Sequence, residues 1–278
     1  MGVDILHAIV LGIVQGLTEF LPISSSGHLE LVPWLFGWED FADPQVGLAF
    51  DTALHLGTLV GVVAYLRRDL VPYVRNGVLT VVSPKRADKR VGLQAWLFVA
   101  SAVPAGLVGV VFEEDIAVLG EPAWIAVSLI GFGLVLWWAD RLRGSRTSGE
   151  FTLADSMLIG LAQILALNPG TSRSGITITM ARMRGFDRDA AARVSFLMSI
   201  PVIGGAVVFQ IASLVSDGIP DGLLAPMIVG IIAAAISGWC AIAGMMRLLR
   251  FRSFGPFVAY RVLVGIAVLG LVLAGFRG

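Results

Sequence analysis

Long apolar runs, separated by short polar segments, dominate the sequence. Six of these runs are about 20 residues long, which is the length of helix that crosses roughly 30 Å of hydrocarbon. They lie at about 46–66, 91–112, 123–140, 194–215, 223–246 and 256–276. The pattern therefore predicts an all-α polytopic membrane protein with six full transmembrane helices.

Two further apolar segments, at about 4–36 and 153–182, are each interrupted by a polar, helix-breaking stretch. The interruptions are Pro22-Ile23-Ser24-Ser25-Ser26-Gly27-His28 and Asn168-Pro169-Gly170-Thr171-Ser172-Arg173-Ser174-Gly175. Irregular backbone at membrane depth persists only where protein or a water-filled cavity supplies hydrogen-bond partners. Each segment is therefore expected to be a re-entrant pair of half-helices around a loop that lines an internal site.

Basic residues predict the orientation of the chain, because positively charged loops stay in the cytoplasm. Three loops carry them: Arg67–Arg90 with seven, Arg141–Arg146 with three and Arg247–Arg252 with three. Three others carry none: Trp38–Pro44, Glu113–Glu121 and Ser216–Asp221. Counting crossings places residues 1–45 on the periplasmic side and 141–193 on the cytoplasmic side, so the two broken segments enter from opposite faces.

The two broken segments also resemble each other. Gly16-Leu17-Thr18-Glu19-Phe20-Leu21 aligns with Gly160-Leu161-Ala162-Gln163-Ile164-Leu165, and Ser24-Ser25-Ser26-Gly27 aligns with Ser172-Arg173-Ser174-Gly175. Two similar halves separated by three crossings have opposite orientations, which is typical of an inverted-topology repeat with its site near the midplane. We expect one integral membrane domain over 1–278, divided into inverted repeats at 1–140 and 141–278.

Composition narrows the function further. Hydrophobic residues make up 56% of the chain and charged residues 14%, whereas soluble domains carry about 25% charged residues. The net charge is zero and the basic residues form short clusters, which argues against a nucleic-acid partner. Because Cys240 is the only cysteine, an intrachain disulfide is excluded and a structural zinc site is not indicated.

The first broken segment carries a carboxylate beside hydroxyl groups. Gln15 and Glu19 are four residues apart, so a helix places both on one face, just before the serine-rich loop. Glu19 is a candidate base or cation ligand, or a helix-end residue that reaches the interface. His28 is a candidate acid or base, or a buried histidine with satisfied hydrogen bonds.

The second broken segment offers a site for an anion. Arg173 lies among hydroxyl residues and glycine, where backbone N–H groups and a guanidinium can hold a phosphate; the alternative is an arginine that extends to the headgroups. Asp51 and His55 are a polar i, i+4 pair inside a span. They either support the site or form hydrogen bonds only with each other. Arg261 is either part of the site or an interfacial anchor. Together these residues suit phosphoryl chemistry, but they do not separate a phosphatase from a transporter of an anionic lipid.

The motifs Gln15-Gly16-Leu17-Thr18-Glu19-Phe20-Leu21-Pro22-Ile23-Ser24-Ser25-Ser26-Gly27-His28 and Pro169-Gly170-Thr171-Ser172-Arg173-Ser174-Gly175 closely resemble those of the undecaprenyl-diphosphate phosphatase, or bacitracin-resistance, family. The likeness continues to Pro256-Phe257 and Tyr260-Arg261, so it covers essentially the whole chain. The resemblance implies a bacterial inner-membrane enzyme of two inverted repeats. Such an enzyme hydrolyses undecaprenyl diphosphate on the outer face and so recycles the carrier lipid for peptidoglycan synthesis.

The resemblance also implies roles for individual residues. Glu19, Ser25, His28 and Arg173 are the expected catalytic residues, with Ser25 or water as the nucleophile. The residues expected to bind substrate are Ser24, Ser26, Gly170, Thr171, Ser172, Ser174, Gly175 and Arg261. A divalent cation, Mg²⁺ or Ca²⁺, is expected at Gln15 and Glu19, although an uncharged Gln15 offers one anionic ligand fewer than a glutamate.

Other functions suit parts of the same sequence. Ser26-Gly27-His28 and Ser172-Arg173 echo lipid phosphatases that use a phosphohistidine, but those need a second histidine after the arginine, and the three histidines here are His7, His28 and His55. A secondary transporter or flippase for an isoprenyl lipid phosphate suits the same architecture. The small residues of 230–244 favour helix packing, either within one chain or in a homodimer.

Overall fold

The computed structural model describes residues 3–41, 43–112 and 120–277, and side chains over the same ranges except 213–217. Within these ranges the regular secondary structure is helical, apart from an isolated bridge between Arg146 and Phe186, and short loops and turns join the helices. The α-helices are α1 (Ile5–Phe20), α2 (Ser25–Phe36), α3 (Pro44–Val82), α4 (Lys89–Ala100), α5 (Val103–Val111), α7 (Pro122–Asp140), α8 (Leu153–Ala162), α9 (Arg173–Met183), α10 (Arg188–Asp217), α11 (Leu224–Leu249) and α12 (Gly255–Leu273). Two short 3₁₀ helices, η2 (Ser148–Glu150) and η3 (Gln163–Leu167), accompany α8. The prediction of an all-α fold is confirmed.

Six helical stretches are long and apolar enough to cross a membrane: α3, the α4–α5 stretch Lys89–Val111, α7, α10 over Arg188–Ala212, α11 and α12. Their outer faces carry large exposed apolar side chains, such as Ile236 on α11 and Leu263 on α12, which are 63% and 67% exposed. Such faces are stable only against hydrocarbon. The six predicted spans of a multi-pass membrane protein are thus confirmed.

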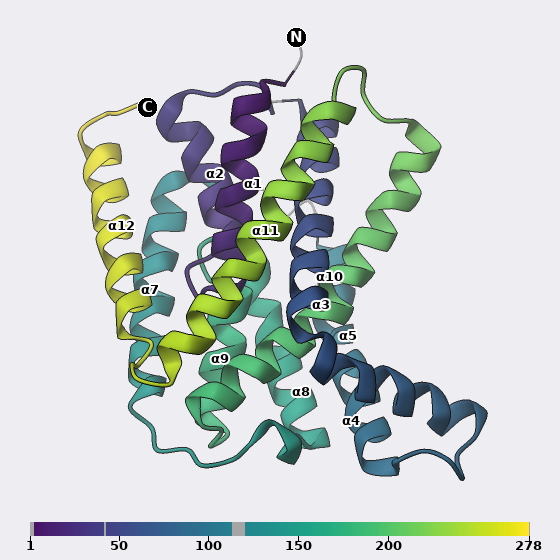
Figure 1. Ribbon diagram of the computed structural model, residues 1–278. Coiled ribbons are helices and arrows are strands. Elements are labelled where there is room, and N and C mark those ends of the chain that lie inside the picture. The colour runs from purple at the N-terminus through teal and green to yellow at the C-terminus, as the bar shows by residue number, and fades with distance from the viewer. Residues whose placement is uncertain (1–2, 42, 113–119, 278) are drawn as a thin grey trace.

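The first span ends later than the sequence indicates. The charge pattern predicts a loop from Arg67 to Arg90, but α3 continues as a helix to Val82, and this second half leaves the bundle beside α4 (Figure 1). Past Leu66 the exposed residues Val71, Val74 and Val78 lie on one face of the helix. Packing against α4 on the neighbouring face stabilises this part of the helix, although its charged residues resemble those of a loop. The predicted loop Glu113–Glu121 lies mostly outside the described residues.

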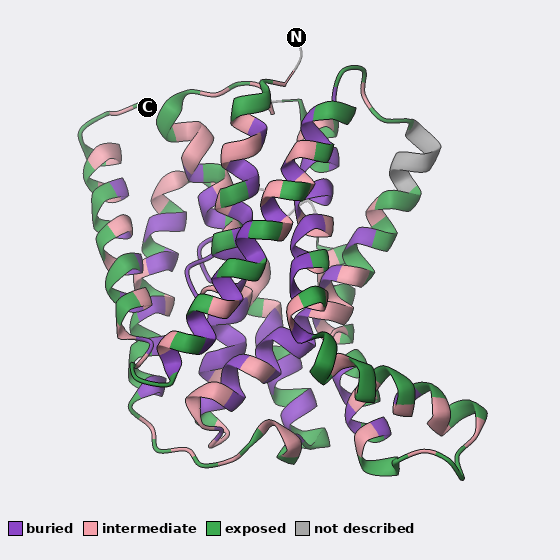
Figure 2. Ribbon diagram, viewed as in Figure 1, coloured by how far each residue is buried: buried purple, intermediate pink, exposed green. Residues whose placement is uncertain are grey.

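The two broken segments lie at opposite ends of the bundle. Figure 1 shows α1 and α2 at the end that holds both chain termini, and α8 and α9 at the other end. Helix α1 stops at Phe20 and α2 starts at Ser25, while α9 starts at Arg173 after the loop that follows η3. Buried residues gather in the middle of the bundle around α9 (Figure 2). The loops of the two segments are therefore internal.

The two loops share one local conformation. Ser24 has φ +77° and Ser172 has φ +75°, in a region that non-glycine residues rarely adopt. Each serine caps the helix that follows it, with the Ser24 hydroxyl accepting from the Gly27 N–H and the Ser172 hydroxyl from the Gly175 N–H. This match agrees with the sequence alignment of the loops; the division into inverted repeats at 1–140 and 141–278 stays a prediction.

Small residues allow α1 and α11 to cross in close contact. A Cβ added at Gly16 would lie 1.9 Å from the Ser237 hydroxyl oxygen and 2.5 Å from the Ala234 carbonyl oxygen. Close backbone approach of this kind is what small residues provide in membrane helices. The small residues of 230–244 therefore pack helices within the chain, and a homodimer stays a prediction.

Replacing Gly16 by Ala should destabilise this crossing, because the added methyl group meets the α11 backbone. We expect a loss of about 1–3 kcal/mol, typical of an overpacked interior, and a lower Tm of the purified protein in detergent. The matched control is Gly131→Ala on α7, where an added Cβ meets nothing within 4 Å. Equal Tm values for the two variants would show that α1 and α11 are not in tight contact.

Candidate active site

The two internal loops are hydrogen-bonded to each other. The Gly170 N–H donates to the Ser24 hydroxyl oxygen at 3.1 Å, and the Ser174 hydroxyl donates to the Leu21 carbonyl oxygen at 3.0 Å. Gly170 has φ +91°, and a Cβ there would lie 2.6 Å from the Ile125 carbonyl oxygen, so only glycine fits. The residues that the sequence singled out in two distant segments thus meet at one place.

Arg261 is hydrogen-bonded to both loops. Its side chain is fully buried, and its guanidinium donates to the carbonyl oxygens of Pro22 at 3.1 Å, Gly170 at 2.8 Å, Leu129 at 3.0 Å and Ser128 at 3.4 Å. Full burial excludes the interfacial anchor that was one of the alternatives for this residue. These contacts indicate that Arg261 positions the loops, whereas its predicted contact with substrate has no support in them.

Glu19 is the centre of a polar cluster at this junction. Its Oε2 accepts from the Ser25 hydroxyl at 2.6 Å and from the Gln15 amide at 3.2 Å, and its Oε1 accepts from the Arg173 guanidinium at 3.1 Å. Glu19 is buried, so it does not extend to the interface. Gln15 lies on the same helical face, as the spacing predicted. The structure therefore brings Glu19, Ser25 and Arg173 into direct contact.

Arg173 begins α9 and reaches into this cluster rather than toward the headgroups. Its side chain is 12% exposed. One terminal nitrogen donates to Glu19 and the other to the Ser195 carbonyl oxygen at 3.4 Å, while the buried Nε has no partner among the described residues. A buried guanidinium with a donor to spare is suited to an incoming anion.

His28 is turned away from the cluster. Its Nδ1 lies 2.7 Å from the Ser24 carbonyl oxygen, and its Nε2 lies 2.8 Å from the Tyr260 hydroxyl. Because a carbonyl only accepts, Nδ1 carries the proton and Nε2 accepts from Tyr260. Both ring nitrogens are thus satisfied, and neither contacts Glu19 or Ser25. The structure does not bring His28 together with the other three predicted catalytic residues.

A different histidine faces Glu19. The Nε2 of His55 lies 4.0 Å from the Glu19 Oε2, and its Nδ1 bonds the Asp51 carbonyl oxygen at 2.8 Å. The sequence left two alternatives for Asp51 and His55: a side-chain pair that bonds only to itself, or support for the site. For His55, these contacts favour support for the site. The i, i+4 spacing of polar residues inside a span was the signal for it, whereas no sequence signal pointed to Tyr260 as the partner of His28.

Most of the residues predicted to bind substrate are buried in hydrogen bonds that shape the loops. Thr171, Ser172 and Ser174 are at most 4% exposed. The Ser172 hydroxyl accepts from the Gly175 N–H, and Thr171 accepts from the Asn168 amide. Only Ser26 among the predicted binding serines is exposed. Their side chains therefore set the loop conformation, which leaves Ser26, Ser25 and Arg173 to face an incoming ligand.

The residues at Glu19 do not by themselves make a resident cation site. Ca²⁺ takes six to eight oxygen ligands, and Mg²⁺ takes six, of which one or two are usually protein carboxylates and the others are water or substrate phosphate. Glu19 supplies one carboxylate that Arg173 already neutralises, Gln15 presents its amide nitrogen, and the described residues contain no cluster of three or more acidic, histidine or cysteine ligands. The predicted cation at Gln15 and Glu19 thus lacks a complete ligand set and stays a prediction.

Known proteins resemble this chain over almost its full length. The family model described as bacitracin resistance protein BacA matches residues 8–267. A protein of Geobacter metallireducens named undecaprenyl-diphosphatase is 47% identical over 268 residues, which cover 95% of this chain and 97% of that protein. Proteins of the same name from Pelobacter propionicus and Nocardioides are 46% and 43% identical, and cover 99% and 98% of this chain and 100% and 98% of their own lengths. The chain belongs to the bacitracin resistance protein BacA family.

Proposed function

We propose that this protein hydrolyses undecaprenyl diphosphate to undecaprenyl phosphate and inorganic phosphate, and so recycles the lipid carrier for cell-wall synthesis. The observation that carries the proposal is the contact of Ser25, Glu19 and Arg173 at the junction of the two loops. It joins a hydroxyl nucleophile, a base and a cation, which are the parts that phosphoryl transfer needs. Relatives at 41–47% identity carry the name undecaprenyl-diphosphatase.

In the first step, the Ser25 hydroxyl attacks the terminal phosphorus while Glu19 Oε2 accepts the hydroxyl proton. The bond from that phosphorus to the bridging oxygen breaks, and undecaprenyl phosphate leaves. Glu19 then gives up this proton to the departing phosphate or to solvent. Water attacks the phosphoserine, Glu19 accepts the proton of that water and passes it to the Ser25 oxygen as the bond from phosphorus to that oxygen breaks, and phosphate is released. Arg173 neutralises the charge that develops on the transferred group. In the variant mechanism, water held by Glu19 attacks the diphosphate directly.

The loop charges support an inner-membrane location with the site open to the outer side. Ser25 and Ser26 follow α1, which begins at the end of the bundle away from the basic loops. The substrate is then a lipid of the outer leaflet whose diphosphate reaches Arg173 from that side. The residues at Glu19 do not complete a cation site. A divalent cation therefore remains in the proposal only as an ion that binds together with the diphosphate, and this is to be tested.

Phosphate release by the purified protein in detergent tests the proposal. With a long-chain isoprenyl diphosphate we expect steady release, and a fall of about 10²–10³-fold for Arg173→Ala, as for the loss of one transition-state donor. The matched control is Arg193→Ala on α10, whose guanidinium pairs with Asp69 and Asp189, and which should keep full activity. Parallel reactions with Mg²⁺ and with EDTA test the cation.

The second candidate function is transport of an isoprenyl lipid phosphate, which broken helices at membrane depth also suit. Detergent micelles have no second compartment, so transport gives no signal there. Binding of the lipid by wild-type protein without phosphate release would therefore contradict hydrolysis and favour transport.

A further inference from the structure

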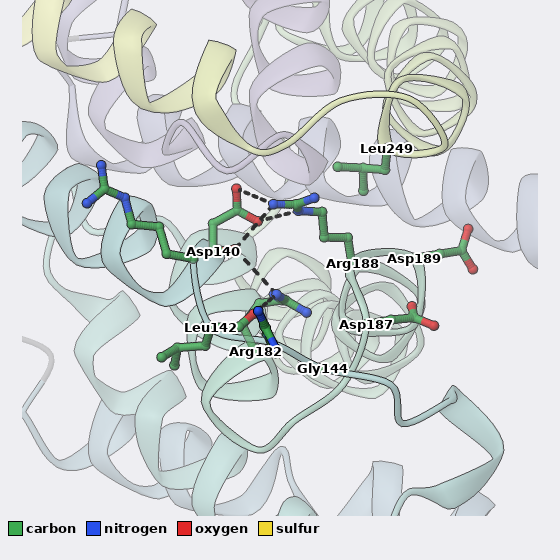
Figure 3. Close-up of a pocket in the computed structure, with 10 residues that line it drawn as sticks. Asp140, Leu142, Gly144, Arg182, Asp187, Arg188, Asp189 and Leu249 are labelled. Carbon is green, nitrogen blue, oxygen red and sulfur yellow. Dashed lines mark hydrogen bonds and ion pairs between the residues drawn. The ribbon is translucent and has the colours of Figure 1, made fainter.

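A polar pocket lies at the end of the bundle opposite to Ser25, among the basic loops. It has a volume of about 520 Å³ and is formed by the end of α7, the turn between α9 and α10 and the end of α11. Figure 3 shows its centre, where Asp140 and Arg188 pair below Leu249. Asp140 is twelve residues along α7 from Ser128, which is about 18 Å of helix. The pocket is therefore separate from the active site.

The carboxylates that line this pocket are already engaged. Asp140 accepts from the Arg188 Nε at 2.6 Å and from the Phe254 N–H at 3.1 Å. Asp187 accepts from the Ala190 N–H at 2.7 Å, and Asp189 accepts from the Arg193 Nε at 2.7 Å. Asp187 and Asp189 also point away from the Asp140–Arg188 pair in Figure 3. The carboxylates are thus held in place by donors of the protein, and two of them face away from the centre of the pocket.

The arginines, in contrast, have donors to spare. Arg182 is 4% exposed and bonds carbonyl oxygens through its terminal nitrogens, but its buried Nε has no partner in the part of the chain that the structure describes. Arg141 stacks over the Trp137 ring with its central carbon 3.4 Å from the ring centroid. Neither Arg141 nor Arg143 has a carboxylate partner among the described residues. The pocket lining thus combines a buried N–H that lacks an acceptor among the described residues with two guanidinium groups that lack a carboxylate there, a set of donors that suits an anion.

We propose that this pocket binds the phosphate group of an anionic phospholipid of the cytoplasmic leaflet. Guanidinium groups bind phosphate through pairs of N–H donors. The lipid is the favoured source, because the pocket lies where α7 and α11 end and includes Leu249, so that acyl chains lie beside the adjoining spans. The anionic surface of this leaflet supplies such headgroups at high local concentration. The proposal does not depend on the reaction at Ser25.

The test compares Arg141→Ala/Arg143→Ala with Arg250→Ala/Arg252→Ala, which removes the same charge from exposed residues of the neighbouring loop outside the pocket lining. Purified protein in a neutral detergent receives phosphatidylglycerol, phosphatidylcholine or inorganic phosphate, and the Tm is recorded. A bound ligand stabilises the folded state. We expect phosphatidylglycerol to raise the Tm of wild type and of the Arg250/Arg252 variant by several degrees. The Arg141/Arg143 variant should lose that increase and keep its phosphate-release activity.

Each other outcome contradicts a definite part of the proposal. Equal loss of the increase in both variants would mean that net charge, not the pocket, attracts the lipid. An equal increase with phosphatidylcholine would exclude an anionic headgroup, and an equal increase with inorganic phosphate would exclude the lipid as the source. No increase in wild type would overturn the site. If the double variant fails to fold, Arg143→Ala alone, on an exposed side chain, gives the same comparison by native mass spectrometry of bound lipid.

Discussion

Replacing Glu19 by Gln is expected to lower kcat by about 10²–10⁴-fold, the usual contribution of a general base. Glu19 is the acceptor for the Ser25 hydroxyl at 2.6 Å, so in the reaction it takes the proton that the nucleophile loses. A glutamine has nearly the same size and can still contact Ser25, but it cannot take up that proton. Phosphate release from a long-chain isoprenyl diphosphate in detergent gives the measurement.

Two serine variants identify which mechanism the loss reflects. Ser25→Ala keeps the ion pair of Glu19 and Arg173 but removes the nucleophile, and Ser26→Ala changes its exposed neighbour. If Ser25 attacks, Ser25→Ala loses activity as Glu19→Gln does, while Ser26→Ala retains most of it. If water attacks directly, Ser25→Ala remains active. Near-normal turnover of Glu19→Gln would remove Glu19 from the mechanism.

Glu19→Gln also removes the carboxylate that pairs with Arg173. Its effect on folding therefore has to be measured separately from its effect on the reaction. Breaking a buried ion pair by removing one partner typically costs about 3–5 kcal/mol, and both side chains here are at most 12% exposed. Thermal unfolding of Glu19→Gln beside Ser25→Ala therefore belongs with the activity assay. Turnover is compared only for the folded fraction of each variant.

Replacing Arg261 by Met should strongly destabilise the folded protein. Ser128 and Leu129 lie inside α7, so their carbonyls keep helical partners, but the carbonyls of Pro22 and Gly170 lie in the loops and would be left buried without a donor. Each such group costs about 1–3 kcal/mol, so we expect a loss of about 2–6 kcal/mol. Arg261→Lys keeps the charge but has fewer donors, so its loss of stability should be smaller than that of Arg261→Met.

Arg146→Met is the matched control for this prediction. Arg146 also bonds backbone carbonyls, together with Asp155, but near η2 and α8, away from the two loops. Both variants should have a lower Tm in detergent. Only the Arg261 variants should also lose turnover per folded molecule, because only they release the loops that hold Ser25 and Arg173. Equal activity of folded Arg261→Met and wild type would show that the loops keep their arrangement without this side chain.

The sequence predicts those features that local patterns determine. Helix-breaking residues within apolar runs mark both loops, and the four-residue spacing places Gln15 beside Glu19, where the two side chains are hydrogen-bonded. The contact of Glu19 with Arg173 spans 154 residues, and only the matching of two broken segments suggests it. The fold class and the polar cluster at Glu19 can therefore be predicted from the sequence.

The remaining differences come from tertiary contacts that leave no local pattern. His28 bonds Tyr260 across 232 residues, so its position next to three serines gives a misleading picture of its neighbours. Burial of Arg261 depends on α7 and both loops at once, whereas its sequence position suggests an interface. The helical segment after Leu66 escapes prediction because its charges resemble those of a loop, while its stability comes from packing against α4.

The residues that form the site and those that fix its loops are synthesised at different times during translation. Ser25 and Arg173 emerge in the first two-thirds of translation, but Tyr260 and Arg261, which fix His28 and the two loops, belong to the last helix. A nascent chain that has inserted α1 to α11 already contains every residue of the Glu19 cluster without the arginine that joins its loops. The direct hydrogen bonds between the two loops do not need α12, but a prematurely terminated chain lacks the side chain that donates to the carbonyls of Pro22 and Gly170 and the hydroxyl partner of His28.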